Sequence, residues 1–515
     1  MKNKMFLKKS VMVATLFVGF LMTSCVNDLN VTPIDPNVTT SASVYNDPAA
    51  YKQGLAKLYA AFALSGQQGP AGQPDIAGID EGFGLYLRSL WYVQEFTTDE
   101  ALWSYEGDAN GTIFNLHYQT WVPTDLIPAA LFARITNAVA LCNEFIRNTA
   151  GAGDTNLKQF NAEARFLRAL AYYHGLDIFG TMPFVTEADK PSAFLPKPIS
   201  RADLFAYLET ELKAIQSDLG PAKFEYGRAD KAAASMLLAK LYLNAEVYLG
   251  AGKGRYTDAL TEINKVIASS YTLAPKYLNN FLADNNTSPE IIFSFNYDAD
   301  LTQAYSMVQV MIAGNAGNGG WSGLRTTSQF VGKFTNDGRG IFAKEDKGQS
   351  LTIDAVNQTK QGYGIYKFRN VKSDGTPGKT NNAGMVDTDF PYFRLADAYL
   401  MYAEAVVRGG TGGDQATALN YVNKLRSRTG DPAIAPVTGS LTLDFILDER
   451  ARELYWEGHR RTDLIRFGKF TGSSYLWDWK GKVKSGSGTE SFRDLFPIPS
   501  TELGANPNLK QNTGY

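Results

Sequence analysis

Two pairs of amphipathic segments, each joined by a glycine-containing turn, constrain the fold of this chain more than any other feature. In the first pair, apolar residues recur at helical spacing over 233–245 and 256–267, on either side of Gly250–Gly254. In the second, residues 395–402 and 418–425 flank a glycine pair. Each pair is about as long as a tetratricopeptide repeat, roughly 34 residues. The pattern predicts helical hairpins that stack on one another.

Further helices and long irregular segments complete a mostly α prediction. Helical periodicity is also readable over residues 48–64, 130–148, 157–178, 202–218 and 442–458. Between the helices lie three stretches rich in Gly, Asn, Ser, Thr and aromatic residues, with only short strand-like pieces such as Glu290–Phe295. These stretches are 66–128, 271–392 and 470–515. Loops of this length are uncommon in a compact domain and are usually functional, so we expect the ligand site on loops carried by a helical frame.

The first residues have the layout of a secretory signal. Four lysines precede an apolar run from Val11 to Met22, which is too short to span a bilayer as a helix, since that needs roughly 20 residues. Small residues then precede Cys25, which predicts cleavage there and acylation of its thiol. We therefore divide the chain into a signal peptide (1–24), a lipidated tether (25–45) and a single domain (46–515).

The charge of the mature chain disfavours nucleic acid as a partner. Removing residues 1–24 takes away four of the 50 basic side chains and none of the 52 acidic ones, which leaves a net charge of about −6. No dense run of Lys and Arg follows residue 9, and polyphosphate binding needs such a basic footprint. A neutral ligand fits this charge better.

No familiar catalytic or metal-binding spacing is present in the sequence. Cys142 lies in an apolar helical stretch and is expected to be a small core residue without a disulfide partner, since Cys25 would carry lipid. The segment Gly250–Gly254 lacks the Ser or Thr that a phosphate loop requires, and the three histidines are far apart, so we expect no bound metal or other cofactor. A glycosidase with paired carboxylates stays an alternative, because spacing in the sequence does not show which carboxylates lie close together in space.

Two groups of side chains are candidates for a ligand site or for the core. Residues 449–466 alternate acidic and basic side chains at helical spacing, which favours an internal ion-pair network over ligand contacts. The loop aromatics suit a sugar, whose apolar C–H face an aromatic ring can cover. Packing as local core is the alternative for each of them. They are Trp91, Trp103, Tyr105, Trp121, Tyr297, Tyr305 and Trp321.

Several segments resemble the SusD/RagB family of Bacteroidota surface lipoproteins, and they follow one another in the family order. The segments are Glu163–Ala169, Phe179–Pro183, Phe393–Ala405, Glu449–Gly458, Asp463–Gly468, Phe496–Pro499, Asn506–Leu509 and Gly514–Tyr515. The resemblance implies a SusD-like fold with tetratricopeptide helix pairs and no catalysis. It also implies a lipid-anchored, surface-exposed protein of the outer membrane that covers a SusC-like TonB-dependent transporter and delivers glycan to it.

Four more segments are similar to starch-binding members of that family. They are Gly72–Gly82, Thr98–Trp103, Gly227–Ala233 and Tyr475–Gly481. The similarity implies an aromatic arc for starch or maltooligosaccharides made by Tyr105, Tyr305 and Trp321, with Trp103 beside it. Asp80, Arg88 and Asp108 would bond sugar hydroxyls.

The chain departs from the starch-binding members at three places, and these bear on whether their ligand-binding residues can be assigned to it. Tyr105 stands where those members have tryptophan, Asp108 stands where they have asparagine, and the stretch 298–321 is shorter. A binder of a different glycan, or a lipid-anchored glycosidase, therefore stays as an alternative. The resemblance further suggests a structural calcium at Asp284, Asp387 and Asp389, with ordinary loop capping as the other interpretation.

Overall fold

The structure is a computed structural model that describes residues 48–66, 74–151, 153–189, 194–302, 304–315, 321–381, 384–428 and 434–515. Residues Lys52–Tyr515 form one compact unit, and the preceding unit, Met1–Tyr51, contributes only Pro48–Tyr51 to the described residues. The predicted signal peptide, Cys25 and the tether lie outside the described residues. The prediction of a single domain over 46–515 stays a prediction.

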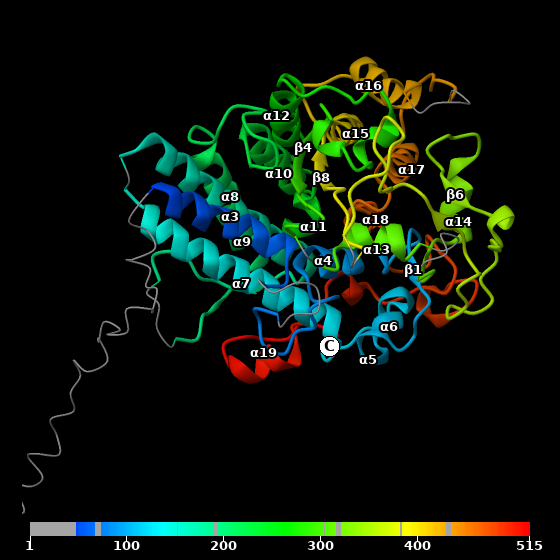
Figure 1. Ribbon diagram of the computed structural model, residues 1–515, viewed down its shortest axis with the longest axis horizontal. Helices are drawn as coiled ribbons and strands as arrows, with labels where there is room; N and C mark the ends of the chain where they lie inside the picture. The colour runs from blue at the N-terminus through cyan, green and yellow to red at the C-terminus, as the bar shows by residue number, and fades with distance from the viewer. Residues whose placement is uncertain are drawn as a thin grey trace, which may run out of the picture. The chain divides into compact units, whose positions relative to one another are not determined.

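A continuous row of packed helices forms the scaffold. Each helix of the row packs against the next, and the last but one also packs against α17 (Figure 1). The row consists of α7 (Leu126–Thr149), α8 (Thr155–Ile178), α9 (Arg201–Ile215), α10 (Lys231–Leu243), α12 (Tyr256–Ile267), α15 (Leu395–Val407) and α16 (Gln415–Ser427), and α17 spans Leu443–Leu454. Both predicted helix pairs are confirmed as α10 with α12 and α15 with α16.

Side-chain caps fix where these helices begin. The carboxylate of Asp154 accepts hydrogen bonds from the backbone N–H groups of Asn156 and Leu157 at the start of α8. Asp230 caps α10 in the same way by accepting from the N–H of Ala233. Such caps satisfy donors that have no partner within the helix. The turn after α10 holds one extra short helix, α11 (Ala245–Leu249), before Gly250 reverses the chain at a φ of 103°.

Buried side chains explain two features that composition alone leaves ambiguous. Cys142 is a buried core residue of α7, as predicted, and burial raises the pKa of its thiol to about 12, which makes it a poor nucleophile. The length and hydropathy of α7 would also allow it to span a membrane. However, α7 packs against α8 and α4 (Tyr86–Glu95), and most of its apolar window is buried, so it is a core helix of this fold.

The prediction that residues 66–128 form one irregular loop is wrong, because α4 lies within it. Nine of its ten residues are buried, and among them are Leu87, Trp91 and Val93. Aromatic and β-branched residues have low intrinsic helix propensity, so packing on all sides stabilises this helix where propensity does not. The other α-helices of the described residues that lie outside the row are α3 (Pro48–Ala63), α5 (Asp108–Gly111), α6 (Ile113–Tyr118), α13 (Met307–Ala313), α14 (Ser328–Val331), α18 (Arg460–Arg466) and α19 (Ser500–Ala505).

Within the described residues, four two-stranded antiparallel sheets connect the long segments between the helices. The longest pairs β4 (Ile291–Phe295) with β8 (Phe390–Arg394), which confirms the strand-like character of that piece of sequence. Its pairing closes a loop of almost a hundred residues that contains part of the candidate site. The other pairs are β1 (Leu102–Trp103) with β5 (Leu324–Arg325), β2 (Met182–Pro183) with β3 (Pro198–Ile199), and β6 (Phe342–Ala343) with β7 (Gly364–Ile365).

The predicted ion-pair network around residues 449–466 is confirmed as a buried structure. Arg394 on β8 lies at its centre and donates to the carboxylates of Glu290, Glu453 and Glu457. All four of these side chains are buried. Because each buried charge meets charges of opposite sign, the network tolerates its removal from water. Further pairs join Arg339 to Glu449, Lys367 to Glu457, Arg450 to Asp397 and Asp463, and Arg466 to Glu404.

Candidate functional site

The pairing of β1 with β5 brings two distant loops of the sequence together. Trp103 is opposite Leu324 in the ladder, and the N–H of Ser104 donates to the carbonyl of Gly323 over 3.0 Å. Tyr105 lies two residues after the end of β1, and Trp321 lies three residues before the start of β5. The two side chains therefore emerge from neighbouring backbone segments at the same end of the small sheet.

Tyr105 and Trp321 are exposed, in contrast to most aromatic residues of this protein. They are 37% and 38% exposed, and they are the only Trp and Tyr residues besides Tyr226 among the exposed large hydrophobic side chains of the described residues. The N–H of Trp321 donates to the carbonyl of Ala313 over 2.8 Å, which ties its backbone to the end of α13. Exposed rings on anchored backbone provide apolar surface for a ligand.

Trp103 supports this surface from below. It is 4% exposed, and its ring meets that of Tyr105 edge to face with centroids 5.4 Å apart. Its indole Nε1 donates to Oδ2 of Asp108 over 2.6 Å. A side chain on Gly323 would place its Cβ 2.9 Å from the Tyr105 ring and 3.0 Å from the Trp103 ring. Only glycine allows the backbone to approach both rings so closely.

Asp108 leads into a short left-handed turn. Ala109, Asn110 and Gly111 have φ values of 51°, 55° and 78°. This conformation costs about 1–2 kcal/mol for each residue that carries a Cβ. Strain of this kind persists only where the surrounding structure imposes it, and it is often found at ligand sites. Here the turn follows directly after the carboxylate that Trp103 holds in place.

Asp80 and Arg88 provide polar groups beside the aromatic surface. Oδ1 of Asp80 accepts from the N–H groups of Gly82 and Phe83 at 2.8 and 2.9 Å. Arg88 on α4 donates from Nε to the Tyr92 hydroxyl over 2.8 Å. Its second nitrogen, NH1, donates to the carbonyl of Tyr305 over 3.3 Å. Asp80 and Arg88 are close to each other, since a Cβ on Gly82 would lie 3.1 Å from Oδ1 of Asp80 and 3.3 Å from NH1 of Arg88.

The electrostatic environment of Tyr92 links these groups to Asp108. Burial raises the pKa of the Tyr92 phenol, Arg88 opposes the rise, and the carboxylates of Asp108 and Asp80 add to it. Both carboxylates are thus near enough to act on one hydroxyl. Tyr92 is not among the site residues predicted from the sequence. Its spacing of four from Arg88 would have indicated it if α4 had been recognised as a helix.

Tyr305 is half-buried and joins the site through its backbone. It precedes the N-cap of α13, where the hydroxyl of Ser306 accepts from the N–H of Gln309 over 3.2 Å. α13 in turn packs against α4, which carries Arg88 (Figure 1). All seven predicted site residues therefore belong to a few connected segments. Whether each of them binds ligand stays a prediction.

Arg325 is a second residue that the sequence analysis missed. It is fully buried on β5, and its guanidinium donates to the backbone carbonyls of Val356, Gln358 and Gln361. Burial lowers its pKa to about 9, and the nearby Tyr105 phenol opposes this. Arg325 thus attaches the 356–361 segment to the strand beneath Tyr105. No sequence signal distinguishes it from the other arginines.

Besides Trp103, three of the seven candidate aromatics are buried core residues. Trp91 is buried on α4 and donates from Nε1 to the carbonyl of Trp456 over 3.0 Å. Trp121 is also buried, and its ring stacks on that of Phe496 with centroids 4.4 Å apart. Tyr297 is buried beside Asp389. For these three, the alternative of local packing is the correct one.

The described residues offer no preformed metal site. No group of three or more His, Cys, Asp or Glu side chains within them is arranged to hold an ion. Asp284 accepts from the N–H of Ser373, and Asp387 accepts from that of Ala299. Asp389 accepts from the Tyr297 N–H and the Tyr226 hydroxyl. These contacts correspond to loop capping, and the calcium at Asp284, Asp387 and Asp389 stays a prediction.

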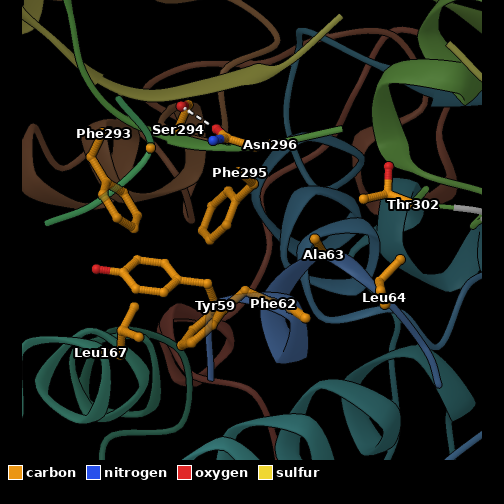
Figure 2. Close-up of a pocket in the computed structure, with 12 residues that line it drawn as sticks. Tyr59, Phe62, Ala63, Leu64, Leu167, Phe293, Ser294, Phe295, Asn296 and Thr302 are labelled. Carbon is orange, nitrogen blue, oxygen red and sulfur yellow. Dashed lines mark hydrogen bonds between the residues drawn. The ribbon is translucent and has the colours of Figure 1, made fainter. Parts of the chain in front are cut away.

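A separate pocket of about 170 Å³ lies between α3, α8 and β4. Figure 2 shows the rings of Tyr59, Phe293 and Phe295 turned toward a common space. The hydroxyl of Tyr59 donates to Glu163 over 2.6 Å, and that of Ser294 donates to Asn296 over 2.6 Å. The lining is mainly apolar, and none of the seven predicted site residues contributes to it. It suits a hydroxylated ligand less well than the exposed surface around Trp321.

Known proteins match this chain in both sequence and structure. The starch-binding protein SusD of Bacteroides thetaiotaomicron is 33% identical over 98% of this chain and 98% of its own length. SusD-like protein P25 of Formosa agariphila is 25% identical over 75% of this chain and 78% of its own length.

Solved structures share the fold. A SusD superfamily protein from Parabacteroides distasonis has a TM-score of 0.71 at 22% identity, covering 93% of this chain and all of the other. Surface glycan-binding protein A from Bacteroides thetaiotaomicron, solved in complex with laminarihexaose, has a TM-score of 0.69 at 21% identity, covering 90% and 99%. The SusD-like fold predicted from the sequence is confirmed. Residues 350–515 also match the model of the SusD family, and together with the full-length identity to SusD this shows that the chain belongs to the SusD family.

Proposed function

We propose that this protein binds starch or maltooligosaccharides at the cell surface through Trp321, Tyr105 and the polar groups around them. One observation carries the proposal: Trp321, the only exposed Trp of the described residues, lies in the same small sheet region as Tyr105. Pyranose rings offer apolar faces to such rings. The chain is also 33% identical over nearly its whole length to a starch-binding protein.

The polar groups around the rings suit sugar hydroxyls. Oδ1 of Asp108 and Oδ2 of Asp80 have no hydrogen-bond partner within the described part of the chain, so both can accept from a hydroxyl. NH2 of Arg88, likewise without a partner there, can donate to one. Charge-assisted hydrogen bonds of this kind are stronger than neutral ones. The site thus combines apolar area with a few directed polar contacts.

We further propose that the protein is anchored in the outer membrane by lipid at Cys25 and delivers glycan to a SusC-like TonB-dependent transporter. The signal-like first 24 residues and the membership of the SusD family support this. Labelling of cells with radioactive palmitate should mark the wild type and not Cys25→Ser. Co-purification of a transporter with the tagged wild-type protein from detergent extracts tests the partner.

The proposed role is binding without catalysis. Isothermal titration with maltoheptaose should give a dissociation constant in the range of about 1 μM to 1 mM, since a shallow exposed site gains limited burial. Reducing ends should not accumulate when the purified protein is incubated with starch. Sustained release of reducing ends would instead identify a glycosidase, and no binding of any α-glucan would refute the proposed ligand.

A different glycan is the alternative, because Tyr105 and Asp108 depart from the starch-binding pattern. The glycan-binding protein solved with laminarihexaose shares the fold at only 21% identity, so the fold by itself does not select a sugar. A glycan array separates the two possibilities. Signals confined to α-1,4-glucans support starch, whereas stronger signals on another glycan would replace it.

A further inference from the structure

We propose that exposed carboxylates around the aromatic surface restrict the site to neutral glycans and exclude acidic ones such as uronates. This inference rests on the proposed function and specifies its ligand class. It follows from the charges on the segments that form the site, which are residues 79–92, 102–111, 305–315 and 321–325. These segments carry four acidic side chains and two arginines: Asp80, Glu81, Glu106, Asp108, Arg88 and Arg325.

Asp108 is the best-fixed of the acidic groups. Its Oδ2 accepts from the indole of Trp103, and Trp103 in turn supports the exposed ring of Tyr105. The carboxylate is therefore held at the edge of the aromatic surface, where it is exposed to solvent. A carboxylate accepts hydrogen bonds but cannot donate them. It stabilises a sugar hydroxyl at this position and repels a sugar carboxylate or sulfate.

Asp80 is also a fixed and exposed carboxylate, and it lies on the side of the site next to α4. Oδ1 is held by the two backbone N–H groups of Gly82 and Phe83, and the side chain is exposed. Both Asp80 and Asp108 act on the Tyr92 phenol, so one ligand bound between them meets the field of both.

The two arginines do not offset the negative charge of these carboxylates. Arg325 is fully buried, and its donors are directed at backbone carbonyls, so it does not reach a ligand. Arg88 is half-buried, and two of its nitrogens already donate to Tyr92 and Tyr305. The adjoining residues 316–320 are Ala, Gly and Asn and carry no charge. The exposed charge next to the rings is thus mainly negative.

Three ligands test this inference: maltoheptaose, maltoheptaose oxidised at C6 to carry carboxylates, and the methyl ester of that oxidised form. The ester lacks the negative charge but keeps the altered C6, so it controls for the lost hydroxyl. At about 10 mM salt we expect the charged form to bind at least about tenfold more weakly than its ester, because charge repulsion is then poorly screened. At about 0.5 M salt the difference should fall to about threefold or less.

Asp108→Asn assigns the effect to the site, since it removes the charge and keeps the size of the side chain. At low salt, we expect this variant to reduce the ratio of the Kd of the charged ligand to that of the ester by about threefold. Asp218→Asn, three residues beyond the end of α9, should leave this ratio unchanged. Equal binding of the charged and esterified forms by the wild type at low salt would overturn the inference, whatever the variant does. Failure of maltoheptaose itself to bind would instead overturn the proposed function.

Discussion

The surroundings of Arg394 and those of Trp321 use charge in opposite ways. Arg394 and the three carboxylates that it contacts are buried, and each is paired with a group of opposite charge. Around Trp321, the charged groups Asp80 and Asp108 are exposed, and each keeps one oxygen without a partner among the described residues. The densest charge in the sequence therefore marks scaffold, and the sparse charge in the loops marks the candidate site.

The same contrast holds for tryptophan. Trp121 is enclosed between Phe496 and Phe470 and bonds to the hydroxyl of Tyr515. Trp321 is one of the few large apolar side chains that face solvent. A buried ring contributes to the free energy of folding, whereas an exposed ring on anchored backbone contributes little to it and is available for binding. Substitutions in the two regions should consequently separate stability from binding.

The largest effect is expected for Arg394→Met. This change leaves Glu290, Glu453 and Glu457 buried with one fewer cation, which should lower the free energy of unfolding by about 3–5 kcal/mol. Chemical denaturation measures the loss. Lys484→Met is the control, since its pair with Asp354 is exposed and should contribute less than about 1 kcal/mol. Equal effects of the two changes would refute the contrast between the regions.

Next in size is the matched pair Trp321→Ala and Trp121→Ala. Loss of the Trp321 ring should weaken maltoheptaose binding by about 2 kcal/mol, roughly 30-fold in Kd, and change stability by less than about 0.5 kcal/mol. Trp121→Ala should instead lower the free energy of unfolding by about 3–5 kcal/mol. Titration calorimetry and denaturation give the two quantities. Unchanged maltoheptaose binding by the Trp321 variant would show that this ring does not contribute to the binding site.

A smaller expected effect is a pH dependence of the free energy of unfolding, which arises from two buried carboxyl groups. Burial raises the pKa of Glu95 to about 7, against 4.5 for an ordinary glutamate, and burial also raises that of Glu100. The folded protein thus holds an extra proton between pH 4.5 and 7, so this contribution to stability is complete below pH 4.5 and is lost as the pH rises through 7.

Glu95→Gln should abolish that contribution to the pH dependence. Between pH 5 and pH 8 we expect the wild type to lose on the order of 2–3 kcal/mol of stability relative to the variant. Denaturation at a series of pH values measures this difference. Glu490→Gln, at an exposed position, should show the same pH dependence of the free energy of unfolding as the wild type. If the Glu95 variant also shows the same pH dependence as the wild type, Glu95 is ionised in the folded protein and its pKa is not raised.

The smallest effect concerns the left-handed turn next to Asp108. Asn110 is exposed and has a φ of 55°. Asn110→Ala should be less stable than Asn110→Gly by about 1 kcal/mol, because alanine tolerates positive φ less well than glycine. Thermal unfolding of the two variants provides the comparison. The opposite order would show that the backbone there is not left-handed.

Much of the scaffold could be predicted from periodicity. The α10–α12 and α15–α16 pairs were found because apolar residues recur at helical spacing in each segment and a glycine-containing turn separates the two segments of each pair. α4 was missed because its segment is rich in aromatic residues and follows a glycine-rich stretch, so its local sequence favours a helix only weakly. Its helical state depends on tertiary packing, and local sequence does not report that packing.

The candidate site was less accessible to reasoning from spacing. Trp91, Trp121 and Tyr297 have the same loop-like sequence context as Tyr105 and Trp321, yet only the last two are exposed. The distinction arises from the pairing of β1 with β5, two-residue strands separated by more than 200 positions. Such pairing has no local sequence signal. Only the family resemblance selected Asp80, Arg88 and Asp108 in advance.

A crystal structure with bound maltoheptaose would show directly whether Trp321 and Tyr105 bind the sugar. We expect glucose rings against the faces of these two side chains, with hydroxyls within about 3.2 Å of Asp80, Arg88 or Asp108. An oligosaccharide bound elsewhere, with these two rings uncovered, would contradict this expectation.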